Sequence, residues 1–246
     1  MKLKLQKGKS MRSFIVSLLQ RICKKLPPNI STISPREARR EFDKLRFTFF
    51  KSNPNWPDRD FNYVNTANIP QELQFAIDCL PVLTQVLQTY PRDNIVSLLD
   101  FGPGYGAGAN LFATLFSSKF LWCKVQVDAL DLKTQRQELA IFDYPLVNYQ
   151  VGEISHLPAE KKWNIIYCSN VIEHVNDPKL LVSELIKRAK DWVILYAPYR
   201  EIELSPGHLN CITEEIFQPF SPELIEIKKS LAWGNQQQIL VLFKGQ

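Results

Sequence analysis

Glycines at alternate positions follow an acidic residue in the segment 96–110. The acid and the glycines are Asp100, Gly102, Gly104, Gly106 and Gly108. Glycine allows a backbone to approach a ligand closely, and a helix that begins here presents unpaired N–H groups and the positive end of its dipole. An acid beside such a turn suits an ammonium group or hydroxyl groups better than a phosphate. The segment therefore predicts a ligand site and disfavours a nucleotide polyphosphate as its ligand.

A second acidic position ends the next apolar segment, residues 122–132. The sequence WCKVQVDALDL is typical of a strand. In open α/β sheets, an acid at the carboxyl end of such a strand accepts hydrogen bonds from ribose hydroxyls. Asp128 and Asp131 are both of the right type. We favour Asp131 because it lies later in the segment, closer to the edge where ligands bind.

Three histidines are candidates for moving a proton, because imidazole titrates near neutral pH. His208 lies in an irregular segment after the fifth predicted strand, where a substrate would enter, and His174 follows the fourth. His156 lies in a predicted surface loop. The best candidate base is His208, and His174, Glu173 and Tyr199 stand behind it. For each histidine, the alternative is a structural or solvent-exposed role.

Strands and helices alternate along residues 95–197, which is the pattern of a doubly wound parallel sheet. We expect strands at 96–100, 122–132, 146–151, 163–169 and 192–197, followed by an antiparallel hairpin of 224–233 and 237–244. We expect helices at 107–117, 133–142 and from Pro178 to about Ala189, a short helix at 213–219, and a helix from Pro70 that Pro81 interrupts. The expected fold class is α/β, with seven mostly parallel strands.

The N-terminal region divides into two segments. Residues 1–30 contain a basic amphipathic helix over 11–26, which is too short and too interrupted to span a bilayer. It would lie on an anionic membrane surface, dock to a partner, or pack on its own domain. Residues 31–94 are a helical and loop extension that we expect to cap the substrate site. Candidate lid residues in this extension are Trp56, Tyr63 and Asn65.

Charge and cysteines narrow the function classes. Residues 1–36 hold nine of the 30 basic residues and none of the 25 acidic ones, so the remainder has a net charge of −4. A core with this charge disfavours nucleic acid as a partner. The five cysteines never form a CxxC pair, so we expect a reducing, cytoplasmic setting with membrane association left open, no disulfide framework and no metal site.

Four segments in this order resemble the class I S-adenosylmethionine-dependent methyltransferases, in particular their small-molecule branch, over residues 95–245. The segments are Asp100–Gly106, Asp131, Gly152–Ile154 and Asn164–Val175, the last ending in Glu-His-Val. Two positions depart from the family pattern, because Asn164 and Glu153 stand where the family usually has Asp. The closing antiparallel hairpin is a further mark of that family.

The resemblance implies a Rossmann-like methyltransferase fold with a C-terminal antiparallel hairpin, a helical N-terminal extension and S-adenosylmethionine as cofactor, bound by the domain 95–246. The implied cofactor-binding residues are Asp100, Gly102, Gly104, Gly106, Asp131, Glu153, Ile154 and Asn170. In such a pocket the ammonium of the cofactor meets Asp100, its carboxylate meets N–H groups at the helix start, and Asp131 takes the ribose hydroxyls. Glu153 and Ile154 meet the adenine.

The expected reaction is transfer of a methyl group to a small-molecule or lipid- or glycan-linked acceptor, most readily at oxygen. Positioning can supply about 7–11 kcal/mol of barrier reduction, but an oxygen acceptor must also lose its proton. A nicotinamide-dependent oxidoreductase is an alternative, although Ala107 replaces the third glycine of GxGxxG and no Tyr-x-x-x-Lys occurs. The other alternative is a non-catalytic scaffold that keeps the fold and is tethered by its N-terminal helix.

Overall fold

The computed structural model describes residues 69–117, 122–132, 143–233 and 236–246. Several expectations lie outside these residues. They are the basic helix at 11–26, the lid candidates Trp56, Tyr63 and Asn65, and the helix at 133–142. Among the described helices, none is both long and apolar enough to cross a membrane.

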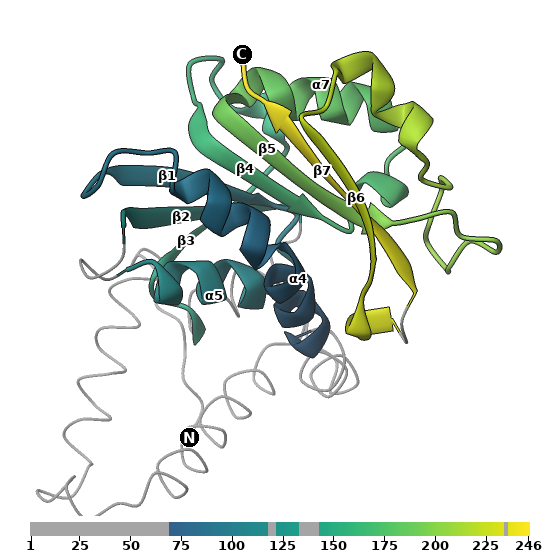
Figure 1. The fold of residues 1–246 in the computed structure, drawn as a ribbon, viewed down its shortest axis with the longest axis horizontal. Helices are drawn as coiled ribbons and strands as arrows, with labels where there is room; N and C mark the ends of the chain where they lie inside the picture. The colour runs from purple at the N-terminus through teal and green to yellow at the C-terminus, as the bar shows by residue number, and fades with distance from the viewer. Residues whose placement is uncertain (1–68, 118–121, 133–142, 234–235) are drawn as a thin grey trace, which may run out of the picture. The chain divides into compact units, whose positions relative to one another are not determined.

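A seven-stranded sheet forms the centre of the fold (Figure 1). Its strands are β1 (Ile95–Phe101), β2 (Lys124–Asp131), β3 (Val147–Val151), β4 (Trp163–Ser169), β5 (Ala189–Pro198), β6 (Leu224–Lys229) and β7 (Gln237–Lys244). The order is β3-β2-β1-β4-β5-β7-β6, and β7 runs opposite to the other six strands of this sheet. The predicted doubly wound sheet with a C-terminal antiparallel pair is therefore confirmed.

Two apolar cores lie on opposite faces of the sheet. On one face, α4 (Ile69–Leu87) and α5 (Ala107–Leu115) pack in a core that includes Phe75, Phe112 and Tyr167. On the other, α7 (Pro178–Arg188) packs in a core that includes Leu185 and Phe243. Figure 1 shows α4 and α5 on one side and α7 on the other. Because α4 contributes to the first core, the fold includes an element that precedes β1.

Helix α4 runs through Pro81 without a break, so the predicted interruption is wrong. Proline removes one backbone N–H, which leaves the carbonyl four residues earlier, at Ile77, without its helical donor. Both residues face outward: Pro81 is exposed and Ile77 is 49% exposed. Water can therefore serve that carbonyl, while the buried side of the helix keeps its packing.

Two predicted elements near the C-terminus are shorter than expected. The helix predicted at 213–219 is a pair of 3-10 turns, η5 (Glu214–Ile216) and η6 (Gln218–Phe220). Proline at position 219 has no N–H with which to continue an α-helix from the first turn. The strand predicted at 224–233 ends at Lys229, and a third 3-10 turn, η7 (Leu231–Trp233), follows it.

Helix α7 begins as its sequence predicts, with a cap followed by proline. The Asp177 carboxylate accepts a hydrogen bond from the Leu180 N–H at 3.0 Å, and Pro178 occupies the first turn, where no helical N–H partner is needed. Three residues, 175–177, separate this helix from the turn η4 (Ile172–His174). The cap therefore fixes where the helix starts.

We expect Asp177→Ala to lower the free energy of unfolding by about 0.5–2 kcal/mol, because the Leu180 N–H loses its acceptor. Asp177→Asn keeps an oxygen at the cap and should retain most of the stability. Urea unfolding followed by circular dichroism measures both variants. Equal stability of Asp177→Ala and the unmodified protein would show that the cap contributes nothing.

Candidate active site

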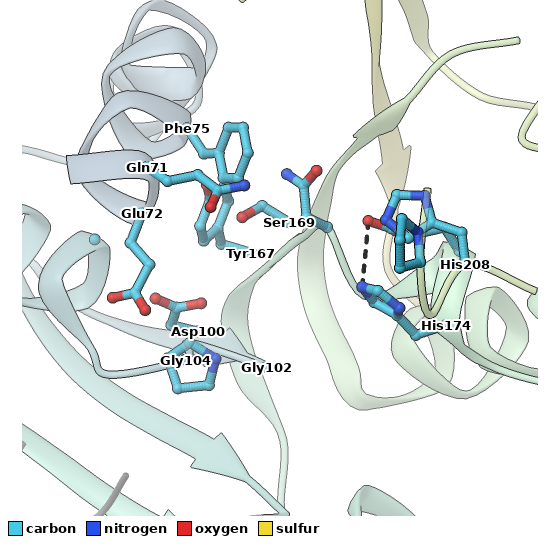
Figure 2. Close-up of a pocket in the computed structure, with 15 residues that line it drawn as sticks. Gln71, Glu72, Phe75, Asp100, Gly102, Gly104, Tyr167, Ser169, His174 and His208 are labelled. Carbon is cyan, nitrogen blue, oxygen red and sulfur yellow. Dashed lines mark ion pairs between the residues drawn. The ribbon is translucent and has the colours of Figure 1, made fainter. Parts of the chain in front are cut away.

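A pocket of about 280 Å³ lies at the carboxyl edge of the sheet. Its walls come from the start of α4, the ends of β1 and β4, the turn η4 and the connection after β5. The lining residues that carry polar chemistry include Gln71, Glu72, Asp100, Ser169, Asn170, Glu173, His174 and His208. Figure 2 shows Glu72 and Asp100 together at one end and the two histidines at the other. Parallel sheets bind ligands at this edge.

The glycine turn after β1 requires glycine at two positions. Gly102 and Gly104 have positive φ angles of 72° and 62°, which other residues adopt only with strain. A Cβ at Gly104 would also lie 2.2 Å from the Glu72 Oε1 atom. The Tyr149 hydroxyl, from β3, donates a hydrogen bond to the Gly104 carbonyl. Tyr149 and Glu72 therefore both hydrogen-bond to this turn, and Gly102 and Gly104 line the pocket.

The Glu72 carboxylate occupies the N-terminus of α5. Its Oε1 accepts a hydrogen bond from the Tyr105 N–H at 2.7 Å, and its Oε2 accepts one from the Ala107 N–H at 3.0 Å. By the family resemblance, N–H groups at this helix start are expected to bind the carboxylate of the ligand. In this structure two of them are engaged with Glu72, so a ligand carboxylate would have to replace that side chain or bind beside it.

Buried acids gather around this end of the pocket. Asp100 is the next-to-last residue of β1 and Asp131 the last of β2, and they are only 3% and 6% exposed. The pKa of Asp100 is raised well above its ordinary value, mainly by burial and further by the negative charges of Glu72 and Asp131. A cationic ligand would relieve this repulsion. The acidic end therefore suits a molecule that carries a positive charge.

The raised pKa of Asp100 predicts a loss of stability with rising pH. The folded state binds this proton more tightly than the unfolded chain, so the free energy of unfolding falls as pH rises from the ordinary value of 3.8 to the raised one. Asp100→Asn cannot ionise, and its free energy of unfolding should fall less over that range. Urea unfolding at a series of pH values tests this.

Glu226→Gln is the control for that experiment, because Glu226 is an exposed acid on β6 whose side chain is 47% exposed. This variant should keep the pH dependence of the unmodified protein. If Asp100→Asn followed the same curve as the unmodified protein, the Asp100 carboxyl would not be the group responsible.

The opposite end of the pocket is formed by Glu173, His174 and His208. The two imidazole rings meet edge to face with their centroids 4.7 Å apart. His174 donates from Nδ1 to the Gly207 carbonyl at 2.9 Å, and Nδ1 of His208 lies 2.5 Å from Oε2 of Glu201. With both Nδ1 atoms engaged in this way, Nε2 is the nitrogen through which each ring would act on a ligand.

Two carboxyls at this end have opposite pKa shifts. Burial raises the pKa of Glu173 to about 8, and the nearby charge of Glu201 adds to the rise. Burial also disfavours ionisation of Glu201, but hydrogen bonds from His208 and Ser205 outweigh it and hold the pKa of Glu201 below its ordinary value. Glu201 thus remains an anion that orients His208, whereas no side-chain hydrogen bond lowers the pKa of Glu173.

Not every predicted site residue lines this pocket. Asp131 and Tyr199 do not, and the Tyr199 hydroxyl donates to Glu214 at 2.5 Å. Gly106 has a φ of 89° and caps α5 without lining the cavity. Asn170 does line it, with a φ of 51° and with no hydrogen-bond partner for either side-chain amide atom among the described residues.

The predicted adenine-binding residues follow β3, away from the lining of this pocket. The side chain of Glu153 is 58% exposed and lies 3.7 Å from His156, whose side chain is 75% exposed. Ile154 is 6% exposed and belongs to the second core. His156 therefore occupies the surface position that the sequence predicts.

Asn164, one of the two departures from the family pattern, is structural. Its Oδ1 accepts hydrogen bonds from the N–H and hydroxyl of Ser97 at 3.0 and 2.9 Å, and its Nδ2 donates to Asp191 at 2.9 Å. It links β1, β4 and β5 near the start of β4. Because ligands bind at the other edge, this substitution leaves the pocket intact.

Several lining or supporting residues are missing from the sequence-based predictions. They are Gln71, Glu72 and Phe75 from α4, Tyr167 from β4, and Glu201, which orients His208. Neither acid in this set, Glu72 or Glu201, belongs to a recognisable sequence motif. An acid in the first turn of the helix that precedes a glycine-rich strand is the one available signal for Glu72.

Comparisons with known proteins identify the family. A family model described as "Methyltransferase domain" matches residues 11–197. Among solved structures, the plantazolicin methyltransferase BpumL in complex with SAH matches with a TM-score of 0.57, at 14% identity, over 80% of this chain and 93% of that one. A comparison with curated protein sequences finds no match.

Two further solved structures are similar. The N-methyltransferase NodS from Bradyrhizobium japonicum WM9 matches with a TM-score of 0.54, at 12% identity, over 82% of this chain and 97% of that one. The CurJ carbon methyltransferase matches with a TM-score of 0.53, at 15% identity, over 67% of this chain, which spans about half (52%) of the CurJ chain. At these identities the likeness establishes the fold.

The family match covers most of the chain, and the fold and the glycine turn agree with it. The resemblance of the sequence motifs to the class I S-adenosylmethionine-dependent methyltransferases is thus confirmed, and the chain belongs to this methyltransferase family.

Proposed function

We propose that this protein transfers a methyl group from S-adenosylmethionine to an oxygen atom of a small-molecule acceptor. The observation that carries the proposal is the polarity of one pocket, which has the half-buried Glu72 and the buried Asp100 at one end and two imidazoles with a carboxyl at the other. A cationic methyl donor suits the first end. A hydroxyl that must lose a proton suits the second.

The cofactor would lie along the edge formed by β1, β2 and β3. Asp100 and Asp131 lie at the ends of the first two strands, and Glu153 follows the third. Because these strands are neighbours in the order β3-β2-β1, the three acids follow one another along the same edge. In this placement Asp100 meets the ammonium group, Asp131 the ribose hydroxyls, and Glu153 with Ile154 the adenine.

The acceptor would lie between the cofactor and the histidines. S-adenosylmethionine supplies a methyl group that is already activated by its positive sulfur. The residues at the histidine end draw the proton from the acceptor hydroxyl, and the oxygen forms a bond to the methyl carbon as the carbon–sulfur bond breaks. The sulfur keeps that electron pair and becomes neutral. Holding the two reactants in line is the main contribution of the protein.

An acceptor carried on a lipid or glycan is the second candidate. The basic amphipathic segment 11–26 favours it, because such a segment suits an anionic membrane surface. Deleting residues 1–26 should abolish sedimentation with anionic vesicles and leave methyl transfer to a soluble acceptor intact. If the intact protein never sediments with such vesicles, this second candidate fails.

Calorimetry with the purified protein tests the cofactor. We expect heat of binding with S-adenosylmethionine and with its demethylated product, and none with NAD. Transfer of labelled methyl groups to a panel of hydroxyl and amine compounds then tests the acceptor atom. Product labelled only at nitrogen would contradict the oxygen assignment, and absence of cofactor binding would favour the scaffold alternative.

Asp131→Ala should weaken cofactor binding by about 1–3 kcal/mol, because charged hydrogen bonds to the ribose are lost. Asp128→Ala is the matched control on the same strand. Asp128 instead accepts hydrogen bonds from Trp163 at 2.7 Å and Asn148 at 2.9 Å. Isothermal titration of both variants is the measurement, and unchanged affinity in Asp131→Ala would remove Asp131 from the site.

His208→Ala should lower kcat by about 100-fold or more, because acceptor activation loses one of its imidazoles. Cofactor affinity should change little, since His208 lies at the far end of the pocket from Asp100 (Figure 2). His156→Ala is the control, because this exposed histidine also lies beside a glutamate, Glu153. Full activity of His208→Ala would exclude it from acceptor activation.

A further inference from the structure

We propose that Glu173, His174 and His208 bind a divalent transition-metal ion at the acceptor end of the pocket. One ligand atom from each residue lies within 4.8 Å of the other two. All three residues line the pocket, and they come from η4 and from the connection after β5. The inference that a metal binds does not depend on the proposed function. The role of the metal in methyl transfer rests on that function.

Both histidines are already oriented as metal ligands are. Metal-bound imidazoles commonly donate their other N–H to a carbonyl or carboxylate, which fixes the ring and its tautomer. His174 donates in this way to the Gly207 carbonyl, and the Nδ1 of His208 is paired with Glu201. Glu201 is held in turn by the Ser205 hydroxyl at 2.8 Å. Each ring therefore directs Nε2 to a cation.

Glu173 supplies the second, independent observation. Its side chain is fully buried, and neither carboxylate oxygen has a hydrogen-bond partner among the described residues. Nε2 of His174 lies 3.8 Å from Oε1, which is beyond hydrogen-bond distance. A buried carboxyl without partners is costly, and a cation at this position would satisfy it. A buried carboxyl without hydrogen bonds thus points to a cation as its ligand.

The donor set favours a first-row transition metal over magnesium or calcium. Two imidazole nitrogens and one carboxylate oxygen suit Zn²⁺, Mn²⁺, Fe²⁺ or Co²⁺, whereas Mg²⁺ and Ca²⁺ prefer oxygen ligands. Ligands about 2.1 Å from such an ion lie roughly 3.4 Å apart in tetrahedral geometry. The three donors would therefore draw together slightly, and the half-exposed side chain of His174 can rotate to do so.

Three protein ligands leave at least one coordination position toward the pocket. An acceptor hydroxyl bound there would have a lower pKa, because a metal ion stabilises the oxygen anion. Its proton could then leave to water while both imidazoles remain ligands. The metal would thus select acceptors that carry a hydroxyl able to coordinate it, such as vicinal hydroxyl or hydroxy-carbonyl compounds, which can coordinate through two oxygens.

Metal titration of the untagged full chain, stripped with a chelator, tests the site without cofactor or acceptor. We expect one equivalent of Co²⁺ or Zn²⁺ to bind by calorimetry, and Mg²⁺ to bind far more weakly. Visible absorption of bound Co²⁺ reports its ligands. Glu173→Gln and His174→Ala should each weaken binding by more than about 100-fold, and Glu201→Gln by about 10–100-fold through lost orientation of His208.

His156→Ala is the matched control, because it removes an exposed histidine beside a glutamate and should leave metal affinity unchanged. His174 is half-exposed, so its removal should not unfold the chain, and circular dichroism verifies this. The proposal is overturned by the absence of stoichiometric binding, by unchanged affinity in Glu173→Gln or His174→Ala, or by thiolate absorption showing cysteine ligands.

The outcomes also separate this proposal from the proposed function. Cofactor binding is measured by calorimetry on the stripped protein, and its absence would overturn the proposed function while leaving the metal result in place. Stoichiometric metal binding with no loss of methyl transfer after stripping would keep the site and remove its part in the reaction.

Discussion

The Glu72 carboxylate couples the helix before the sheet to the glycine turn. Its two oxygens accept from the backbone N–H groups of Tyr105 and Ala107, where α5 begins and its dipole is positive. Gly104 must lack a side chain for this contact to exist. This interaction joins the start of α4 to the start of α5 in the wall of the pocket, and it places a negative charge near Asp100.

The buried acids of the pocket destabilise the folded state, and apolar packing in the two cores compensates for this. Asp100 is buried beside two other acids, and Glu173 is buried without a hydrogen bond. Neither arrangement stabilises the unliganded fold, because buried charge and unpaired polar atoms are unfavourable. Both become favourable when a positive ligand arrives. Unfavourable burial of this kind is common at ligand sites. Here the apolar packing on both faces of the sheet keeps the fold stable despite it.

The fold followed from the sequence because its signals are local. A few neighbouring residues are enough to recognise each of them: the buried strands that alternate with helices, the glycines after β1, and the Asp177 cap. The same holds for Asp100 and Asp131 at strand ends. The contacts of Glu72 and Glu201 could not be predicted, because these acids act on residues that only the tertiary fold brings near. The continuity of α4 through Pro81 likewise depends on which side of the helix faces solvent, and the sequence alone does not show this.

The two ends of the pocket are built differently, and this bears on substrate choice. The acidic end consists of residues at the ends of strands and helices, whose positions the sheet register fixes. The histidine end depends on a docked connection: the N–H groups of Leu209 and Asn210 donate to the Glu173 carbonyl, and the Asn210 side chain donates to Val175. A few loop hydrogen bonds thus bring His208 to His174. Changes in this connection would alter the histidine end of the pocket without disturbing the strand ends at which we propose that the cofactor binds.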